Sequence, residues 1–216
     1  MSWTAVVNSD RFRAHYAWAS RGRTGEGRLV LEGEDLQDAR TSGKDFSYSS
    51  ILRCTFDGAE MVYYIFDGGE IRECSVLGST FQHARFRDAR IERTRFGGAD
   101  LRESWFLRAL VDHCNFDTAS LRGGNFVSAL VAGCSFRGAN LEEVQLDKGQ
   151  FRHCDFRDAK LRIDLAHDAL FEDCDFRGAN FDRRRLKDTV FTRCKFAGIT
   201  GMPTVEGGYT VIDPDF

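Results

Sequence analysis

The chain has 216 residues, with 30 Lys and Arg against 33 Asp and Glu, so its formal net charge is −3. Direct binding to nucleic acid or to an anionic membrane surface is not expected, because both favour a strongly basic protein. The sequence also lacks an uninterrupted apolar run of about 18 residues, the length that a membrane-spanning helix requires.

The first part of the chain is expected to be a cap. Phe12, Tyr16 and Ala19 recur at helical spacing after Ser9, a residue type that often begins a helix. We therefore predict a short helix over about residues 9–20. It would cover one end of the structure that follows, because an open sheet edge invites pairing with other chains.

A five-residue period governs the middle of the chain. From Leu31 to Phe196, nearly all of the 34 positions spaced by five are large and apolar. Seventeen of the nineteen phenylalanines lie on this lattice, where chance would place about a fifth of them. A small side chain stands two residues before most lattice positions. Self-similarity at one fixed period indicates a repeat architecture.

The cysteines reveal a longer period of 20 residues. All seven occupy the small slot of the repeat, and their spacing is 20 residues except for one gap of 40, where Thr94 fills the skipped slot. They are Cys54, Cys74, Cys114, Cys134, Cys154, Cys174 and Cys194. Four five-residue units therefore make one physical turn of the chain.

A period of five fits neither a helix nor a plain strand. It fits a short strand that alternates inward, outward and inward, followed by a two-residue corner. Four such units form a square coil, in which each residue lies over the residue 20 positions later. Coils stacked at the strand spacing of about 4.8 Å would form a rod about 40 Å long. We predict an all-β protein, a parallel β-helix with a core of stacked phenylalanines and leucines.

The repeating unit resembles that of the pentapeptide-repeat family. It reads small, any, Leu or Phe, polar, then polar or Gly, as in residues 139–143 (Ala-Asn-Leu-Glu-Glu) and 174–178 (Cys-Asp-Phe-Arg-Gly). The resemblance covers about residues 31–200. It implies a right-handed quadrilateral β-helix. It also implies a protein-binding role, since the best understood members bind DNA gyrase or topoisomerase IV as DNA mimics.

Three parts follow from this pattern. Residues 1–30 are the N-terminal cap with its short helix, residues 31–200 are the β-helix, and residues 201–216 are a tail. The regular lattice is predicted to end at Gly201-Met202-Pro203, and the tail looks extended and is expected to cap the last coil. Both prolines lie outside the repeat, as expected where ladder N–H groups are needed.

No catalytic or metal-binding constellation is evident in the sequence. His113 and His153 share a column but lie two coils apart, about 10 Å, which is too far to share a metal. There is no Gly-rich phosphate loop and no C-x-x-C pair. The cysteines are interpreted as buried core filler rather than as a redox or metal ladder. We expect no enzyme activity and no cofactor, and reduced thiols in a cytoplasmic location.

Two irregularities are candidate sites. The first is a set of apolar residues in outward slots that flank one corner, and a patch of this kind typically marks an interface. Its members are Trp105, Leu107, Leu110, Val127, Leu130, Leu165 and Leu170. The second is the pair Asp164 and Arg184, which fill small inward slots one coil apart. This pair is either a bulged recognition site or a local distortion that turns both side chains outward.

Two main functional hypotheses remain. The first is a non-enzymatic scaffold that binds another protein, or a second copy in a homodimer, through the outer faces of the rod. The alternative is a DNA mimic that protects DNA gyrase or topoisomerase IV from quinolones or natural poisons. Mimicry of a phosphate backbone needs a dense negative surface, whereas residues 31–200 hold 25 Lys and Arg against 28 Asp and Glu. The tail also lacks the helical character of the C-terminal helices that join the family's gyrase-protecting dimers.

Overall fold

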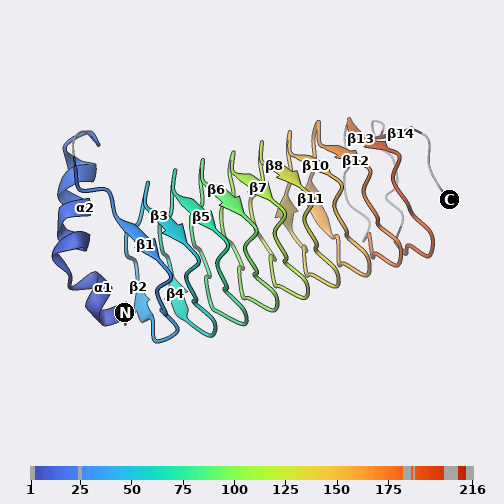
Figure 1. Ribbon diagram of the computed structural model, residues 1–216. Coiled ribbons are helices and arrows are strands. Elements are labelled where there is room, and N and C mark those ends of the chain that lie inside the picture. Colours follow the sequence, from blue (N-terminus) through green and yellow to red (C-terminus); the bar gives the residue numbers. More distant parts are fainter. Residues whose placement is uncertain (1–2, 24–25, 182–185, 187, 202–208, 213–216) are drawn as a thin grey trace.

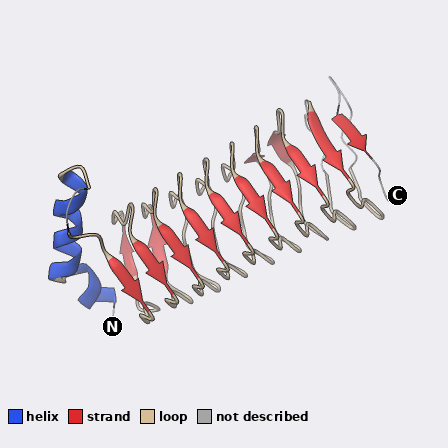
Figure 2. Cartoon of the chain, turned by 45° about the horizontal axis from the view of Figure 1, so that its top comes forward, coloured by secondary structure: helices blue, strands red, loops and turns tan. Residues whose placement is uncertain are grey.

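The computed structural model describes residues 3–23, 26–181, 186, 188–201 and 209–212. Two short helices stand at the N-terminal end of a stack of square coils (Figures 1 and 2). Every named pair of neighbouring strands is parallel, and with the exception of one register shift each residue pairs with the residue 20 positions later. The chain is therefore the four-sided parallel β-helix that the five-residue period predicts.

One side of the coil, called face A, forms a continuous ten-stranded sheet whose strands run side by side along the rod (Figure 2). Its strands are β1 (Val30–Glu32), β3 (Ser50–Leu52), β5 (Glu70–Arg72), β6 (Arg90–Glu92), β7 (Leu110–Asp112), β8 (Leu130–Ala132), β10 (Gln150–Arg152), β12 (Leu170–Glu172), β13 (Thr189–Thr192) and β14 (Tyr209–Ile212).

The other three sides are held mostly by isolated parallel bridges. Face B follows face A along the chain and carries the cysteine column on its inner side. Face C contains β2 (Arg40–Ser42) and β4 (Glu60–Val62), and face D contains β9 (Val144–Gln145) and β11 (Ile163–Leu165). The corner takes up part of each five-residue unit, so only a short strand of two to four residues remains.

The corner explains the last slot of each unit. At Phe136, for example, the carbonyl accepts a hydrogen bond from the amide of Ala139 at 3.0 Å, which closes the turn. The residue before Ala139 is Gly138, whose φ is 63°. A positive φ at this turn position favours glycine, because in this conformation the Cβ of any other residue crowds the residue's own backbone. Polar residues such as His113 (φ 50°) occupy the same slot in other units.

The core is a set of stacked aromatic columns. Phe116, Phe136 and Phe156 are buried beneath face B and stack with ring centroids 4.9 Å apart at each step. A second column under face D includes Phe106 and Phe126, 4.6 Å apart. The two columns meet edge to face, with Phe106 and Phe116 at 89°. Offset stacking and edge-to-face contacts are the preferred aromatic geometries, so this core stabilises one register throughout.

The cysteine column is a second buried layer. All seven cysteines are free and buried, and Thr94 is buried in the skipped slot. The thiols donate to backbone carbonyls, as from Cys174 Sγ to Phe151 O at 3.4 Å. Burial raises the pKa of the Cys174 thiol well above its ordinary value. At the two ends of the column the direction is opposite, because hydrogen bonds with Cys74 and Cys174 lower the pKa of Cys54 and of Cys194. All seven side chains nevertheless pack as small, buried groups.

Two helices cover the first coil, where a single helix was predicted. The predicted helix is present as α2 (Asp10–Ser20), capped by Ser9, whose side chain accepts from the amide of Phe12. The additional helix, α1 (Trp3–Val7), has only five residues. A helix this short has little stability of its own, so its contacts with the coil hold it.

The cap is joined to the core by apolar and polar contacts. Trp3 is buried, lies 5.2 Å from the ring of Phe46, and donates from Nε1 to Thr41 Oγ1 at 2.9 Å. His15 is also buried, and its Nδ1 accepts a hydrogen bond from the amide of Leu29 at 3.0 Å. The cap therefore seals the first coil and satisfies a backbone donor at the start of the sheet.

The tail returns to the sheet. Strand β14 pairs with β13 in parallel, with Tyr209 opposite Thr189 and Ile212 opposite Thr192. The spacing of 20 residues therefore recurs beyond Gly201, where the lattice was predicted to end. Residues 202–208 and 213–216 lie outside the described part of the chain.

The aromatic column predicts a large difference between inward and outward substitutions in one unit. Replacing the fully buried Phe136 by Ala should lower the free energy of unfolding by about 3–5 kcal/mol, because a cavity opens between two stacked rings. Replacing Arg137, whose side chain is 53% exposed, should cost under about 0.5 kcal/mol. Urea denaturation of both variants checks this, and equal losses would contradict the inward and outward assignment.

The buried histidine predicts acid sensitivity of the cap. Burial is the main cause that lowers the pKa of His15, so the unfolded state takes up a proton before the folded state does. The stability should be unaffected by this group above about pH 6.5 and should fall as the pH drops below it, by at most about 1.4 kcal/mol per pH unit. Urea midpoints of the wild type and His15→Gln across this range measure the effect. His113→Gln, which removes an exposed histidine, is the control for the loss of an imidazole.

The buried cysteine column predicts that the native thiols react slowly with labelling reagents. The seven native thiols should react with a thiol reagent only as fast as the coils open, because each is buried. The variant Leu77→Cys, which places a thiol at a 38% exposed position, should show one additional, rapidly labelled thiol. Mass spectrometry of the labelled native protein gives the count. Rapid labelling of most native cysteines would contradict the packing described above.

Candidate functional site

The candidate site is an outer surface of the rod rather than a catalytic pocket. Within the described residues, no group of three His, Cys, Asp or Glu side chains is placed to hold a metal ion. None of the helices in the described part of the chain is long and apolar enough to cross a membrane. The outward columns of the four faces are therefore the features to compare.

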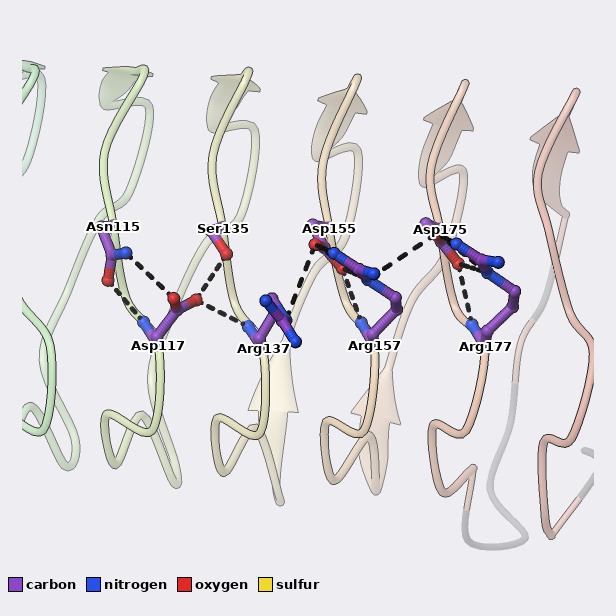
Figure 3. A network of polar contacts seen from close by, with 8 residues as sticks. All are labelled: Asn115, Asp117, Ser135, Arg137, Asp155, Arg157, Asp175 and Arg177. Atoms are coloured by element: carbon purple, nitrogen blue, oxygen red, sulfur yellow. Dashed lines mark hydrogen bonds and ion pairs between the residues drawn. The ribbon is translucent and has the colours of Figure 1, made fainter.

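Face B carries a ladder of alternating charge (Figure 3). Arg157 lies between two carboxylates: its side chain donates to Asp155 of the same coil, and its Nε lies 3.8 Å from Asp175 of the next. Arg137 and Arg177 repeat the pattern on either side, with Arg137 Nε 4.0 Å from Asp155. The three stacked arginines are thus neutralised by carboxylates along the whole run.

The ladder also fixes the charge state of its acids. Partial burial alone would raise the pKa of Asp155, but hydrogen bonds from Arg157 hold that pKa below its usual range. The pKa of Asp175 is lowered in the same way by hydrogen bonds from Arg177. Face B is therefore a surface of paired charges and offers neither a net negative nor an apolar patch.

Face A differs, because part of its outer surface is apolar. Its outward residues form two columns, one on each side of the buried central residues. The first column runs Val30, Ser50, Glu70, Arg90, Leu110, Leu130, Gln150, Leu170 and Val190. The second column runs Glu32, Leu52, Arg72, Glu92, Asp112, Ala132, Arg152, Glu172 and Thr192. The first column changes from charged to apolar between β6 and β7.

We call Leu110, Leu130, Leu170 and Val190 the apolar strip. Its three leucines are 43%, 44% and 39% exposed. A shallow depression of about 250 Å³ lies beside Leu110 and Leu130, and another of about 160 Å³ lies beside Leu170 and Val190. The strip therefore offers shape as well as apolar area.

Charged pairs flank the strip in the second column. Arg72 Nε lies 3.4 Å from Glu92, on the N-terminal side. Arg152 Nε lies 3.1 Å from Glu172, on the C-terminal side. Between these two pairs stand Asp112 and the small Ala132. Leu110 and Leu130 therefore have a charged pair on each side, whereas Leu170 lies beyond Gln150 on the same strand as Glu172.

The structure divides the predicted apolar set between two faces. Leu110, Leu130 and Leu170 lie on face A, in the register of one column. Trp105, which is 47% exposed, and the half-buried Leu107 and Val127 lie on face D. Leu165 belongs to β11, also on face D.

The two groups lie on either side of one corner, where Arg108 stands in one coil and Ser128 in the next. Arg108 lies in the turn between Leu107 and Leu110, and its Nε is 2.7 Å from Asp88 of the preceding coil. On face D, Trp105 is bridged to the polar residues Arg85 and Asn125. Trp105 is therefore a single exposed aromatic among polar neighbours in its column, whereas the face A leucines recur along theirs.

The irregular pair is only partly described. Strand β11 pairs with β9 with a register shift between Ile163 and Leu165, so the backbone around Asp164 departs from the regular coil. Arg184 lies outside the described residues. The pair of side chains predicted from the sequence therefore stays a prediction.

Sequence reasoning missed several members of this surface. Val190 and Ala132 belong to face A by register, and so do the flanking charges Glu92 and Arg152. The signal was present in the 20-residue spacing, because position 190 continues the column of Leu110, Leu130 and Leu170.

Comparison with known proteins identifies the repeat. Family models described as pentapeptide repeats match residues 65–105, 125–162 and 168–199, which together make up about half of the chain. No curated protein sequence matches the chain.

Several solved structures are similar in fold. One is HetL, a pentapeptide-repeat protein involved in heterocyst differentiation regulation from the cyanobacterium Nostoc sp. strain PCC 7120, with 17% identity and a TM-score of 0.45 over 96% of this chain and 94% of that one. Another is a trypsin-treated form of QnrB1, a plasmid-mediated fluoroquinolone resistance protein, with 23% identity and a TM-score of 0.39 over 85% of this chain and 89% of that one.

Proposed function

Because this chain belongs to the pentapeptide-repeat family, we propose that it is a non-enzymatic scaffold that binds another protein through face A. The observation that carries the proposal is the apolar strip, three partly exposed leucines in one column of a rod whose outer slots are mostly polar. Contiguous exposed apolar residues with a polar rim mark protein interfaces.

The strip has enough apolar area to contribute to binding. Burying a whole leucine side chain contributes about 1.5–3 kcal/mol. Burying the exposed part of one strip leucine would therefore contribute roughly 1 kcal/mol. The charged pairs on either side of Leu110 and Leu130 supply the polar rim. Their arrangement favours a partner of matching charge pattern, because charge complementarity sets specificity more than affinity.

The surrounding fold keeps this surface rigid. Strands β7 and β8 are each bonded to both neighbours in the ladder, and Val111 and Val131 beneath Leu110 and Leu130 are buried. Side chains on a rigid sheet lose little conformational freedom on binding, which lowers the cost of association. A preformed surface of this kind suits a scaffold better than a catalytic site, which needs convergent polar groups.

The charge pattern does not support the alternative of DNA mimicry. A mimic of a phosphate backbone needs a dense negative surface, whereas the carboxylates of face B are paired with Arg137, Arg157 and Arg177. A gyrase supercoiling assay, with and without a fluoroquinolone, separates the two functions. The scaffold proposal expects no change in supercoiling, and protection of gyrase would support the mimic instead.

A charge placed in the strip tests the proposal. Leu130→Glu should reduce binding of the captured partner at least tenfold, because the interface would desolvate a carboxylate without a counter-charge. Affinity capture from the source organism, followed by titration of the captured protein, measures this. The matched control is Leu77→Glu, the same change at a 38% exposed leucine on face B, which should bind normally.

Circular dichroism of both variants shows whether the fold is retained, since a surface slot tolerates a carboxylate. If Leu130→Glu stays folded and binds as well as the wild type, face A is not the binding surface. If Leu77→Glu alone loses binding, the interface lies on face B.

A further inference from the structure

We propose that the protein recognised by face A is a second copy of this chain, packed antiparallel about a two-fold axis that runs along the strands between β7 and β8. This inference rests on the proposed use of face A as a binding surface. It follows from the order of residues in the two outward columns, which is self-complementary in this one register.

The symmetry fixes which residues meet. A two-fold axis parallel to the strands reverses the order of the coils and keeps each column opposite itself. Strand β7 of one copy then lies opposite β8 of the other, β6 opposite β10, and β5 opposite β12. Such an interface is isologous, so every contact occurs twice.

The apolar contacts fall at the centre. Leu110 of one copy meets Leu130 of the other, and the symmetric contact repeats it on the other side of the axis. Both leucines are more than two-fifths exposed in the single chain. Ala132 lies beside them in the second column, lines the same depression, and faces Asp112 of the second copy. Central, well-packed apolar anchors are the usual energetic core of an interface.

The charged residues on both sides of the centre also match. In the second column, Glu92 lies opposite Arg152 of the other copy, and Arg72 lies opposite Glu172 of the other copy. All four side chains are outward and partly exposed, and each already has an opposite charge within its own chain. The dimer therefore converts two separate pairs per chain into four-membered networks that span both copies.

Shifting the axis destroys this match. An axis through β8 sets Glu92 against Glu172, and an axis between β8 and β10 sets Asp112 against Glu172. An axis through β7 sets Asp112 against itself, and one through β10 sets Arg152 against itself. Like charges facing one another in an interface are strongly unfavourable. An axis between β10 and β12 avoids them but sets no leucine against another leucine. Leucine contacts and charge pairing together therefore favour the axis between β7 and β8.

A parallel arrangement of the two rods is also unfavourable. It sets the first column against the second, so that Leu110 faces Asp112 and Leu170 faces Glu172, and no leucine meets another leucine. The antiparallel dimer has weaker points away from its centre: Glu70 lies opposite Leu170, and the corner residues set Glu73 against Asp173 and Arg53 against Arg193. We therefore expect a dissociation constant in the micromolar range, as for small, transient interfaces.

A charge swap tests the register directly. Glu92→Arg and Arg152→Glu should each weaken the dimer about tenfold or more, since each sets like charges opposite one another at two symmetric places. The double variant carrying both changes should restore dimerisation close to the wild-type value, because each pair is re-formed with reversed polarity. Sedimentation equilibrium over roughly 1–200 µM protein measures all four chains.

The rescue separates contacts between copies from effects within one chain. Within a chain, Arg at position 92 would face Arg72 and Glu at position 152 would face Glu172, so a purely intrachain effect would be additive and the double variant would be the worst of the four. Arg177→Glu on face B is the matched charge-reversal control and should dimerise normally.

The result expected is a dimer that both single variants weaken and the double variant restores. A wild type that stays monomeric across this range overturns the inference, and so does a dimer that the double variant fails to restore. Neither result excludes the proposed function. Face A would still be a binding surface if the wild type captures a different protein and Leu130→Glu does not.

Discussion

The stacking of each inward side chain on the residue 20 positions later is the interaction on which this structure depends. It is visible in the run of Phe116, Phe136 and Phe156, whose rings repeat at 4.9 Å. That spacing matches the distance between bonded strands, so the ring stack and the backbone ladder reinforce one another. A shift of one residue would turn the whole inward set to the outside, which explains why the five-residue period is kept along most of the chain.

This constraint leaves the outward slots free to differ between faces. Face B uses them for a ladder of Asp155, Arg157 and their neighbours, in which each charge is matched within the chain. Face A has matched charges on both sides of the exposed residues Leu110 and Leu130. The proposed function and the proposed dimer both follow from that contrast, because the surface whose apolar groups are still exposed gains most from a partner.

The sequence predicts the regular part of this structure better than its ends and exceptions. The coil and the inward columns follow from a period that no other element shares, and helix α2 follows from Ser9 and the spacing of Phe12 and Tyr16. Helix α1 carries too few residues to show a helical period, and its buried Trp3 finds its place only through contacts with the coil.

The candidate surface was predictable only in part, because columns of residues 20 apart are not evident by eye. Leu110, Leu130 and Leu170 were found as apolar exceptions, but Trp105 was grouped with them although Arg108 and its ion pair with Asp88 lie at the corner between the faces. The exposure of an outward side chain depends on which residues fill the adjacent slots, so it cannot be predicted from that residue alone.

Hydroxyl-radical footprinting of the free and the assembled protein tests most directly whether face A is buried on association. The reactivity of Leu110 and Leu130 should fall in the assembled form, while Leu77 on face B and Tyr63 at the corner after face C, which are 38% and 57% exposed, should react equally in both forms. Unchanged reactivity of the two face A leucines, or protection of Leu77 instead, would contradict the account.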